Sequence, residues 1–326
     1  MSLPGVTVVI PVWNGRDLLL RLLEKLRGQT YPITEVLAVD NGSEDGAADA
    51  AEQAGARVLR LGSNRGFASA VNQGVEACRT ELVALVNSDV EPEPDWLAYL
   101  VRAMDSPDVW FATGKTLSAS QRNRIDGTYD LISRAGCAWR VGNGRLDGPE
   151  FSQARRIAMA PATAALFRTE LFHRVGLFDT AFESYLEDVD FGLRCAVEGL
   201  RGAYLPEAVA YHWGSASLGK WNPKIVRLTA RNQVYLVSKH GLFRQFWWPI
   251  LVGQLLWGLV ALRHGAGWAF VRGKLAGVEQ ALACSNKPKH VPPGLAEILQ
   301  DSELQILKAQ RRTGFNLYWR VYFLLA

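Results

Sequence analysis

The chain has 326 residues, of which 48% are hydrophobic and 21% charged, a composition that fits about two folded domains and excludes a disordered or fibrous protein. Cys78, Cys137, Cys195 and Cys284 lie far apart without a Cys-x-x-Cys pair, which argues against a zinc ribbon or a disulfide framework and is typical of a reducing cytoplasm. The N-terminal sequence MSLPGVTVVIPVWNG has no basic segment and no cleavable apolar stretch, so we expect no secretory signal.

The net charge of +4 conceals an uneven distribution along the chain. Residues 1–213 contain 21 Lys and Arg against 28 Asp and Glu, whereas residues 214–326 contain 15 against 4. Seven of the eleven tryptophans also fall at Trp213 or later. This basic, tryptophan-rich part predicts an anionic partner, and both nucleic acid and a membrane surface fit the charge.

The first ninety residues alternate between two hydrophobic periodicities. Short apolar, β-branched runs predict buried parallel strands at residues 6–11, 36–40, 57–62 and 82–89. Amphipathic or alanine-rich segments between them predict helices at residues 17–27, 45–54 and 67–78. Strands that alternate with helices in this way predict a doubly wound α/β sheet.

Small or polar residues follow each of these four strands. Ligands of such sheets bind at the carboxyl ends of the strands, where the loops meet the helix N-termini. Turn chemistry alone explains any one of these loops, but four at one edge predict a binding site. The loop residues are Trp13-Asn14-Gly15, Asp40-Asn41-Gly42-Ser43, Asn64-Arg65-Gly66 and Asn87-Ser88-Asp89.

The middle of the chain is less regular. Residues 118–149 are rich in Gly, Arg and Asp and predict loops or a hairpin over that edge. A small apolar segment at 158–168, a short helix at 170–175, a helical stretch that ends near Gly199 and a last strand at 203–212 follow.

A basic helix is expected at residues 221–240, followed by an uncharged run at 246–262 between Arg244 and Arg263. At about 1.5 Å per residue this run barely crosses a bilayer core, and basic residues on both flanks give no orientation. We therefore favour a helix that lies in or dips into the membrane interface. A spanning helix and a buried hairpin are the alternatives. The aromatic tail at 318–323 fits either a headgroup boundary or a docking helix.

Acidic residues at the strand ends have both a functional and a structural interpretation. Asp40 suits the imide N–H of a pyrimidine base, or it caps a turn. Asp89, next to Asn87, suits a hard divalent cation that bridges a diphosphate, or it caps the helix after Pro92.

Two further groups could complete a site. Glu187-Asp188-Val189-Asp190 places three carboxylates before a helix, where acids stabilise the N-terminus, but such a cluster can also raise a carboxylate pKa to that of a general base. His212 is either a structural histidine or, if it faces Asp89, a metal ligand. The sequence has no P-loop, no Gly-x-Gly-x-x-Gly and no nucleophile elbow, which argues against ATP hydrolysis on a P-loop, a dinucleotide cofactor and a Ser or Cys nucleophile.

The motifs VTVVIPVWNG, VDNGSEDG, NRGFASAVNQG, LVNSD, FESYLEDVDFGLR and YHWGSAS, in this order, resemble glycosyltransferase family 2 over about residues 6–217. The resemblance implies an inverting sugar-nucleotide transferase with a GT-A fold: a doubly wound, mostly parallel sheet with a C-terminal helical, membrane-associating extension. It also implies a catalytic domain at 1–215, with the nucleotide-sugar part at about 1–117 and the acceptor and base part at about 118–215, and a membrane-associating region at 216–326.

The resemblance also assigns roles to individual residues. Asp188 is the implied catalytic base, next to Glu187 of the same motif, and Asp89 and His212 are the implied ligands of Mg²⁺ or Mn²⁺. One departure is Asn87, an amide where the family's metal motif has its first carboxylate, which predicts weaker metal affinity. The residues implied to bind the nucleotide-sugar are Pro11, Val12, Asn14, Asp40, Asn64, Arg65, Gly66, Asn87 and Ser88.

Within the family, FxxYxEDVDxxLR followed by PEAxxxHxGxxS most resembles the bacterial rhamnosyltransferase-like branch. That likeness implies a dTDP-rhamnose or UDP-sugar donor, a polyprenyl-pyrophosphate-linked acceptor and cell-envelope polysaccharide synthesis. The expected location is the cytoplasmic face of the bacterial inner membrane, on anionic lipid and without nucleic acid, and a homo-oligomer is compatible with it. The alternatives are a nucleotidyltransferase and a non-catalytic sugar-nucleotide or glycolipid-binding protein, the latter supported only by Asn87.

Overall fold

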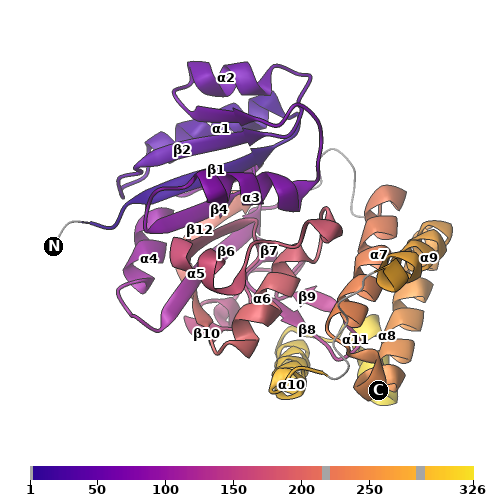
Figure 1. The fold of residues 1–326 in the computed structure, drawn as a ribbon. Coiled ribbons are helices and arrows are strands. Elements are labelled where there is room, and N and C mark those ends of the chain that lie inside the picture. Colours follow the sequence, from indigo (N-terminus) through magenta and orange to yellow (C-terminus); the bar gives the residue numbers. More distant parts are fainter. Residues whose placement is uncertain (1–2, 215–220, 284–290) are drawn as a thin grey trace.

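The computed structural model describes residues 3–214, 221–283 and 291–326. A ten-stranded sheet with the order β10-β12-β6-β11-β4-β1-β2-β3 runs through the molecule, with β5 paired to β12 and β7 paired to β6 (Figure 1). The strands of this sheet are β1 (Val6–Val12), β2 (Glu35–Asp40), β3 (Arg57–Arg60), β4 (Leu82–Val86), β5 (Val90–Pro92), β6 (Val109–Ser118), β7 (Ile125–Gly127), β10 (Arg155–Ile157), β11 (Ala164–Arg168) and β12 (Arg201–His212).

Helices cover both faces of the sheet because alternate residues of its buried strands are apolar. Val8 and Ile10 of β1 pack with α1 and α4, whereas Val9 packs with α3 on the other face. The α5 and α6 helices lie on the same face as α3. The helices of this part are α1 (Arg16–Arg27), α2 (Ala47–Gln53), α3 (Phe67–Ala77), α4 (Trp96–Ala103), α5 (Thr169–Val175) and α6 (Glu187–Val197), with the 3-10 turns η1 (Pro149–Phe151) and η2 (Thr180–Phe182).

The antiparallel strand β11 lies between β4 and β6 and pairs with both. The strands β1–β4 are parallel to one another, and β12 is parallel to β6. The carboxyl ends of β1, β2, β3, β4, β6 and β12 therefore meet at one edge, where the amino end of β11 also lies.

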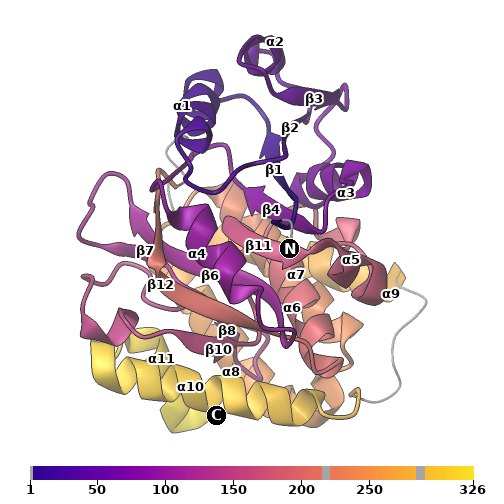
Figure 2. The ribbon, with the colours of Figure 1, turned by 90° about the vertical axis from the view of Figure 1, so that its left-hand side faces the viewer.

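A small hairpin and five further helices complete the fold. The hairpin of β8 (Asp130–Ile132) and β9 (Ala138–Arg140) contacts α10, which runs along the bottom of the view in Figure 2. The α7 and α9 helices pack along each other, and α8 packs against α9 and α11 (Figure 1). These helices are α7 (Pro223–Lys239), α8 (Phe243–Arg263), α9 (Gly267–Ala283), α10 (Leu295–Thr313) and α11 (Leu317–Leu325).

The predicted α/β alternation is confirmed, with two strands shorter than expected: the one predicted at 57–62 ends at Arg60. The strand predicted at 82–89 ends at Val86, because a turn in which Val90 N–H donates to the Asn87 carbonyl at 3.1 Å leads directly into β5. Residues 118–149 contain the β8–β9 hairpin, as the sequence predicted. The uncharged run at 246–262 lies within α8, which kinks at Phe246 and is long and apolar enough to cross a membrane, with a third of its most apolar stretch buried. In the aromatic tail, Trp319 and Tyr322 are buried against the core, which favours the docking-helix interpretation.

Candidate active site

The loop after β2 is held closely against the loop after β1. Asp40, 5% exposed, accepts a hydrogen bond through Oδ1 from the Ser43 N–H at 3.1 Å. Asn14, with a positive φ of 60°, donates its N–H to Ser43 Oγ at 2.8 Å and accepts from the Glu44 N–H at 2.9 Å. Asp40 is therefore partly a turn residue. Among the described residues, only one of its two carboxylate oxygens accepts a hydrogen bond, so the other is available to a ligand.

Pro11 and Val12, the two β1 residues that were expected to bind the nucleotide-sugar, have buried side chains. The Val12 side chain is buried in the core with α1, and the Val12 carbonyl accepts from the Asn41 N–H at 2.8 Å. Pro11 is a buried β1 residue opposite Val39 of β2. Any contact of Val12 with a ligand is therefore limited to its backbone.

The buried amide of Asn41, a loop residue to which the sequence assigned no role of its own, fixes the loop after β3. The Asn41 amide nitrogen donates to Asn64 Oδ1 and to the Gly66 carbonyl, both at 3.2 Å, and Asn41 Oδ1 accepts from the Arg65 N–H at 2.9 Å. Gly66 has a φ of 87°, and a Cβ there would lie 2.8 Å from the Glu183 carbonyl oxygen. The Arg65 guanidinium is exposed and donates to the Leu61 carbonyl. Gly66 thus joins this loop to the segment before α6.

Asp89 and His212 meet at the end of β4 and β12. Asp89 Oδ1 lies 3.2 Å from His212 Nε2, and Asp126 Oδ2 lies 2.8 Å from His212 Nδ1. Burial alone would lower the pKa of His212, but its hydrogen bonds to Asp126 and Asp89 raise it to about 9. Asp126 is a residue that the sequence did not single out. Its place matches the carboxylates that orient metal-binding histidines through the other ring nitrogen.

The donor atoms at this position fit a hard divalent cation. An octahedral Mg²⁺ with bonds of about 2.1 Å places neighbouring ligands about 3 Å apart, close to the separation of Asp89 and His212. Nearby in the chain, Asn87 Oδ1 is buried without a hydrogen-bond partner among the described residues. No group of three or more His, Cys, Asp or Glu that could hold a metal occurs in residues 3–214, 221–283 and 291–326. Mg²⁺ sites use one or two protein carboxylates and complete the shell with phosphates and water.

Asp188 lies at the same edge of the sheet as Asp89. Its Oδ2 accepts from the Ala162 N–H at 3.2 Å, and the next residue, Thr163, accepts the Asn87 N–H at 2.9 Å. Because β11 starts at Ala164 opposite Val86, residues 162 and 163 extend past the end of β4 toward Asp89. Ser88, between Asn87 and Asp89, is half-buried in the same turn.

Neighbouring charges set the protonation of the two acids at the start of α6. Burial and the nearby Asp130 carboxylate raise the pKa of Asp188 to about 6, against the opposing charge of Arg140, 3.6 Å away. Burial and Asp188 raise the pKa of Glu187 well above its usual value, and Glu187 Oε2 is buried without a partner among the described residues. A pKa of about 6 leaves Asp188 ionised at neutral pH, and the pKa of its neighbour Glu187 is shifted upward.

Arg140 and Asp130, from the β8–β9 hairpin, form the surroundings of Asp188. Arg140 Nε donates to Asp130 Oδ1 at 3.1 Å, and another guanidinium nitrogen donates to Thr163 Oγ1 at 3.1 Å. The only hint of this arrangement in the sequence is that residues 118–149 are rich in Arg and Asp. The hairpin therefore supplies both the cation and the second carboxylate that act on Asp188.

The segment immediately before Asp188 has an unusual backbone that α7 supports. Glu183, Tyr185 and Leu186 have φ values of 60°, 70° and 71°, which cost energy for residues other than glycine. Asn232, 0% exposed on α7, donates its amide to the carbonyls of Phe182, Ser184 and Tyr185 at 2.7–2.8 Å. We call residues 183–186 the base loop. A helix from the C-terminal region, α7, therefore holds the base loop, which leads directly into the start of α6 and Asp188.

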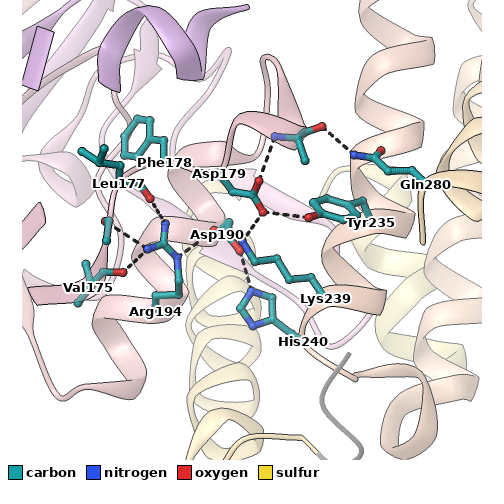
Figure 3. Close-up of polar contacts among 12 residues, drawn as sticks. Val175, Leu177, Phe178, Asp179, Asp190, Arg194, Tyr235, Lys239, His240 and Gln280 are labelled. Atoms are coloured by element: carbon teal, nitrogen blue, oxygen red, sulfur yellow. Dashed lines mark hydrogen bonds and ion pairs between the residues drawn. The ribbon is translucent and has the colours of Figure 1, made fainter. Parts of the chain in front are cut away.

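The third acid of the cluster, Asp190, lies among the side chains of Arg194, Lys239 and His240 (Figure 3). Asp190 accepts from Arg194 at 3.0 Å and from Lys239 and His240 of α7 at 2.9 Å each. Burial opposes its ionisation, but the hydrogen bond from His240 and the charges of Lys239 and Arg194 hold the pKa of Asp190 well below its usual value. Asp190 therefore anchors α6 to α7 and is unavailable for chemistry.

Comparisons with known proteins assign the chain to a family. A family model described as "Glycosyl transferase family 2" matches residues 7–176. Pre-mycofactocin glycosyltransferase of Mycobacterium tuberculosis (strain ATCC 25618 / H37Rv) is 30% identical over 220 residues, 66% of this chain and 44% of that protein. N-acetylglucosaminyl-diphospho-decaprenol L-rhamnosyltransferase of the same strain is 27% identical over 293 residues, 79% of this chain and 92% of that protein. This chain spans less than half of the length of the first curated relatives that it matches.

Solved structures share the fold at low sequence identity. A mannosyltransferase from Pyrobaculum calidifontis in complex with GDP-Man and Mn²⁺ has a TM-score of 0.54 and 20% identity, and the match covers 99% of this chain and 87% of that chain. GalNAc-T7 with UDP, GalNAc and Mn²⁺ has a TM-score of 0.61 and 14% identity, over 78% of this chain and 51% of that chain. The predicted GT-A-like fold with a C-terminal helical region is thus confirmed.

Proposed function

Because this chain belongs to glycosyl transferase family 2, we propose that it is an inverting, metal-dependent glycosyltransferase that moves a sugar from a nucleotide diphosphate to a hydroxyl of a lipid-linked glycan. The single observation that carries the proposal is one sheet edge that joins the Asp89–His212 pair to the ionised Asp188. Such an edge offers a cation position for a diphosphate and a base for an acceptor hydroxyl.

The donor would bind over the ends of β1–β4. In this proposal the free carboxylate oxygen of Asp40 accepts an N–H of the base, and the loop of Asn64, Arg65 and Gly66 lies near the ribose and the diphosphate. Asp89 and His212 would hold Mg²⁺ or Mn²⁺, with Asp126 orienting the His212 ring. The bound cation would neutralise the negative charge that develops on the departing diphosphate.

Asp188 would act as the general base. It would take the proton from the acceptor hydroxyl as that oxygen attacks the anomeric carbon, on the face opposite the leaving nucleotide. A pKa of about 6 keeps Asp188 ionised at neutral pH and basic enough to accept a proton. Arg140, at 3.6 Å, would orient Asp188.

For the donor and acceptor we propose dTDP-rhamnose, with UDP-sugars as the alternative, and a polyprenyl-pyrophosphate-linked glycan of cell-envelope polysaccharide synthesis. The support is the L-rhamnosyltransferase that this chain matches over 79% of its length, whose name specifies a decaprenol diphosphate substrate. The apolar α8 and the excess of basic residues after position 213 support a position on anionic lipid at the cytoplasmic face of the inner membrane.

A transfer assay tests the proposal. Purified full-length protein is incubated with dTDP-rhamnose or UDP-sugars, with Mg²⁺ or Mn²⁺, and with N-acetylglucosaminyl diphospholipid, and nucleoside diphosphate release and the anomeric configuration of the product are measured. We expect release that depends on acceptor and metal, with an inverted anomeric centre. Donor binding without any transfer would favour a non-catalytic binding protein, and pyrophosphate release from a nucleoside triphosphate would favour a nucleotidyltransferase.

A further inference from the structure

A pocket that none of the site residues lines lies where the start of α7 meets the turn between α8 and α9. It has a volume of about 380 Å³, and its walls include Lys224 and Arg227 of α7 and Trp268 and Arg272 of α9. Small residues of the turn, Gly265 and Ala266 among them, form the rest of the wall and leave the pocket open.

The pocket concentrates positive charge without a protein counter-ion. Lys224, Arg227 and Arg272 are exposed, and none of the three forms an ion pair with an acid in the part of the chain that the structure describes. The stretches 215–220 and 284–290 contain no Asp or Glu in their sequence. Three like charges around one pocket repel one another, and a dianion would remove that repulsion. Guanidinium groups match the geometry of phosphate oxygens in particular.

An apolar surface leads away from this pocket along two helices. Leu255, Leu259 and Leu262 form an exposed row on α8, with Leu262 65% exposed. Trp268, 72% exposed, starts a second row on α9 that continues through Leu275. The α8 and α9 helices pack side by side (Figure 1), and the α9 row begins at Trp268, which is itself part of the pocket wall. A ligand that matches both surfaces has a phosphate at one end and a hydrocarbon chain.

The pocket also lies next to the candidate active site. Lys224 Nζ is 5.5 Å from the centre of the exposed Trp13 ring. Trp13 directly precedes Asn14 in the loop after β1, over which the donor would bind. Seven residues further along α7, Arg231 forms an ion pair with Glu183 of the base loop. At a rise of 1.5 Å per residue this is about 10 Å along the helix axis, the length of a short glycan.

We propose that the pocket of Lys224, Arg227, Trp268 and Arg272 binds the phosphate group of the lipid acceptor, while its hydrocarbon chain lies on the exposed rows of α8 and α9. The inference rests on the proposed function, and it specifies the part of the protein that binds the lipid acceptor. The glycan attached to that phosphate would then extend past Trp13 toward Asp188.

The test uses the double variant R227Q/R272Q, with R311Q/R312Q on α10 as the matched control, since it removes the same charge from exposed side chains outside the pocket. Binding of geranyl diphosphate and of geraniol is measured by calorimetry on the full-length protein. We expect the wild type to prefer the diphosphate. The pocket variant should bind geranyl diphosphate roughly 10- to 100-fold more weakly, as the loss of two charge-assisted contacts predicts, and the control should bind it as the wild type does. Equal binding by the pocket variant and the wild type would overturn the inference.

The transfer assay separates the acceptor from bulk lipid. The KM for the diphospholipid acceptor should rise in R227Q/R272Q, whereas the KM for the same sugar on a neutral alkyl chain should stay constant. Binding to vesicles of phosphatidylcholine with phosphatidylglycerol should fall equally in the two double variants. If only R227Q/R272Q loses vesicle binding while its acceptor KM is unchanged, the pocket binds headgroups and the inference is wrong. If the wild type transfers no sugar but binds geranyl diphosphate through these arginines, the proposed function fails and the phosphate pocket stands.

Discussion

The sheet edge and the C-terminal helices differ in how their polar residues are held. At the edge, Asp40 is the last residue of β2 and accepts from the N–H of Ser43, three residues later, and Asp89 lies in the short turn between β4 and β5. In the helices, Asn232 and His240 of α7 bind groups about fifty residues earlier in the chain, in the base loop and in α6. The edge thus offers the chemical groups, and α7 holds the segment that delivers Asp188 to them. The two regions form one functional unit.

The largest expected effect comes from the edge. Asp188→Asn keeps the size of the side chain but removes the base, so we expect turnover to fall about 10²- to 10⁴-fold while donor affinity is nearly unchanged. Steady-state kinetics and calorimetry with the donor measure the two quantities. Glu198→Gln, a neutral change at the exposed end of α6, is the control. Turnover in Asp188→Asn equal to that of Glu198→Gln would remove Asp188 as the base.

The next largest effect is expected at Asp190, whose buried ion pairs connect α6 to the end of α7. Asp190→Asn leaves Lys239, His240 and Arg194 without their buried carboxylate, so we expect the free energy of unfolding to fall by about 3–5 kcal/mol. Glu35→Gln, which removes the partly exposed pair with Arg57, should cost less than about 1 kcal/mol. Urea denaturation measures both.

The pH dependence of that stability has a definite sign. Because the pKa of Asp190 is lowered in the folded protein, its contribution is fully present above the pKa of an unfolded Asp, about 3.9, and is lost as the pH falls through the folded value. The difference between wild type and Asp190→Asn should therefore shrink in acid. A constant difference down to the lowest pH at which both variants fold would contradict this role.

A smaller effect is expected when the support of the base loop is removed. Asn232→Ala deletes the three hydrogen bonds that hold the base loop through the carbonyls of Phe182, Ser184 and Tyr185, so we expect kcat to fall about tenfold, with the donor KM unchanged. Asn222→Ala removes only the N-cap of α7, which costs about 1 kcal/mol of stability, and serves as the control. Equal kcat in the two variants would show that α7 merely stabilises the fold.

The smallest effect is a shift along the pH axis. With a pKa of about 6 for Asp188, kcat should fall about tenfold per pH unit below that value, because the protonated acid accepts no proton. Arg140→Met removes the cation that lowers this pKa, so the acid limb of the profile should move to higher pH. The kcat profile at saturating substrates measures the shift. A profile that stays in place would mean that Arg140 does not act on the base.

Local patterns predicted a large part of the fold and the position of several site residues. The runs at β1 to β4 and the polar turns after them are short-range features, and the structure brings Asp89 to His212 as the sequence hypothesis required. The sequence did not predict a role for Asp126, Arg140 or Asn232, because the residues next to them in the chain form no recognisable motif. Each gains its importance from a contact made across the fold.

The sequence by itself determined the alternation of buried strands and helices, and hence the edge at which polar turns gather, because periodicity and turn chemistry act over a few residues. Only the tertiary structure decided which carboxylate is ionised and which is an anchor. Glu187, Asp188 and Asp190 lie within four residues, yet burial and neighbouring carboxylates raise the pKa of the first two, whereas the hydrogen bond from His240 and nearby positive charges lower that of the third. The physical reason is that a charge in a protein interior responds to the groups that folding places around it, whatever their distance along the chain.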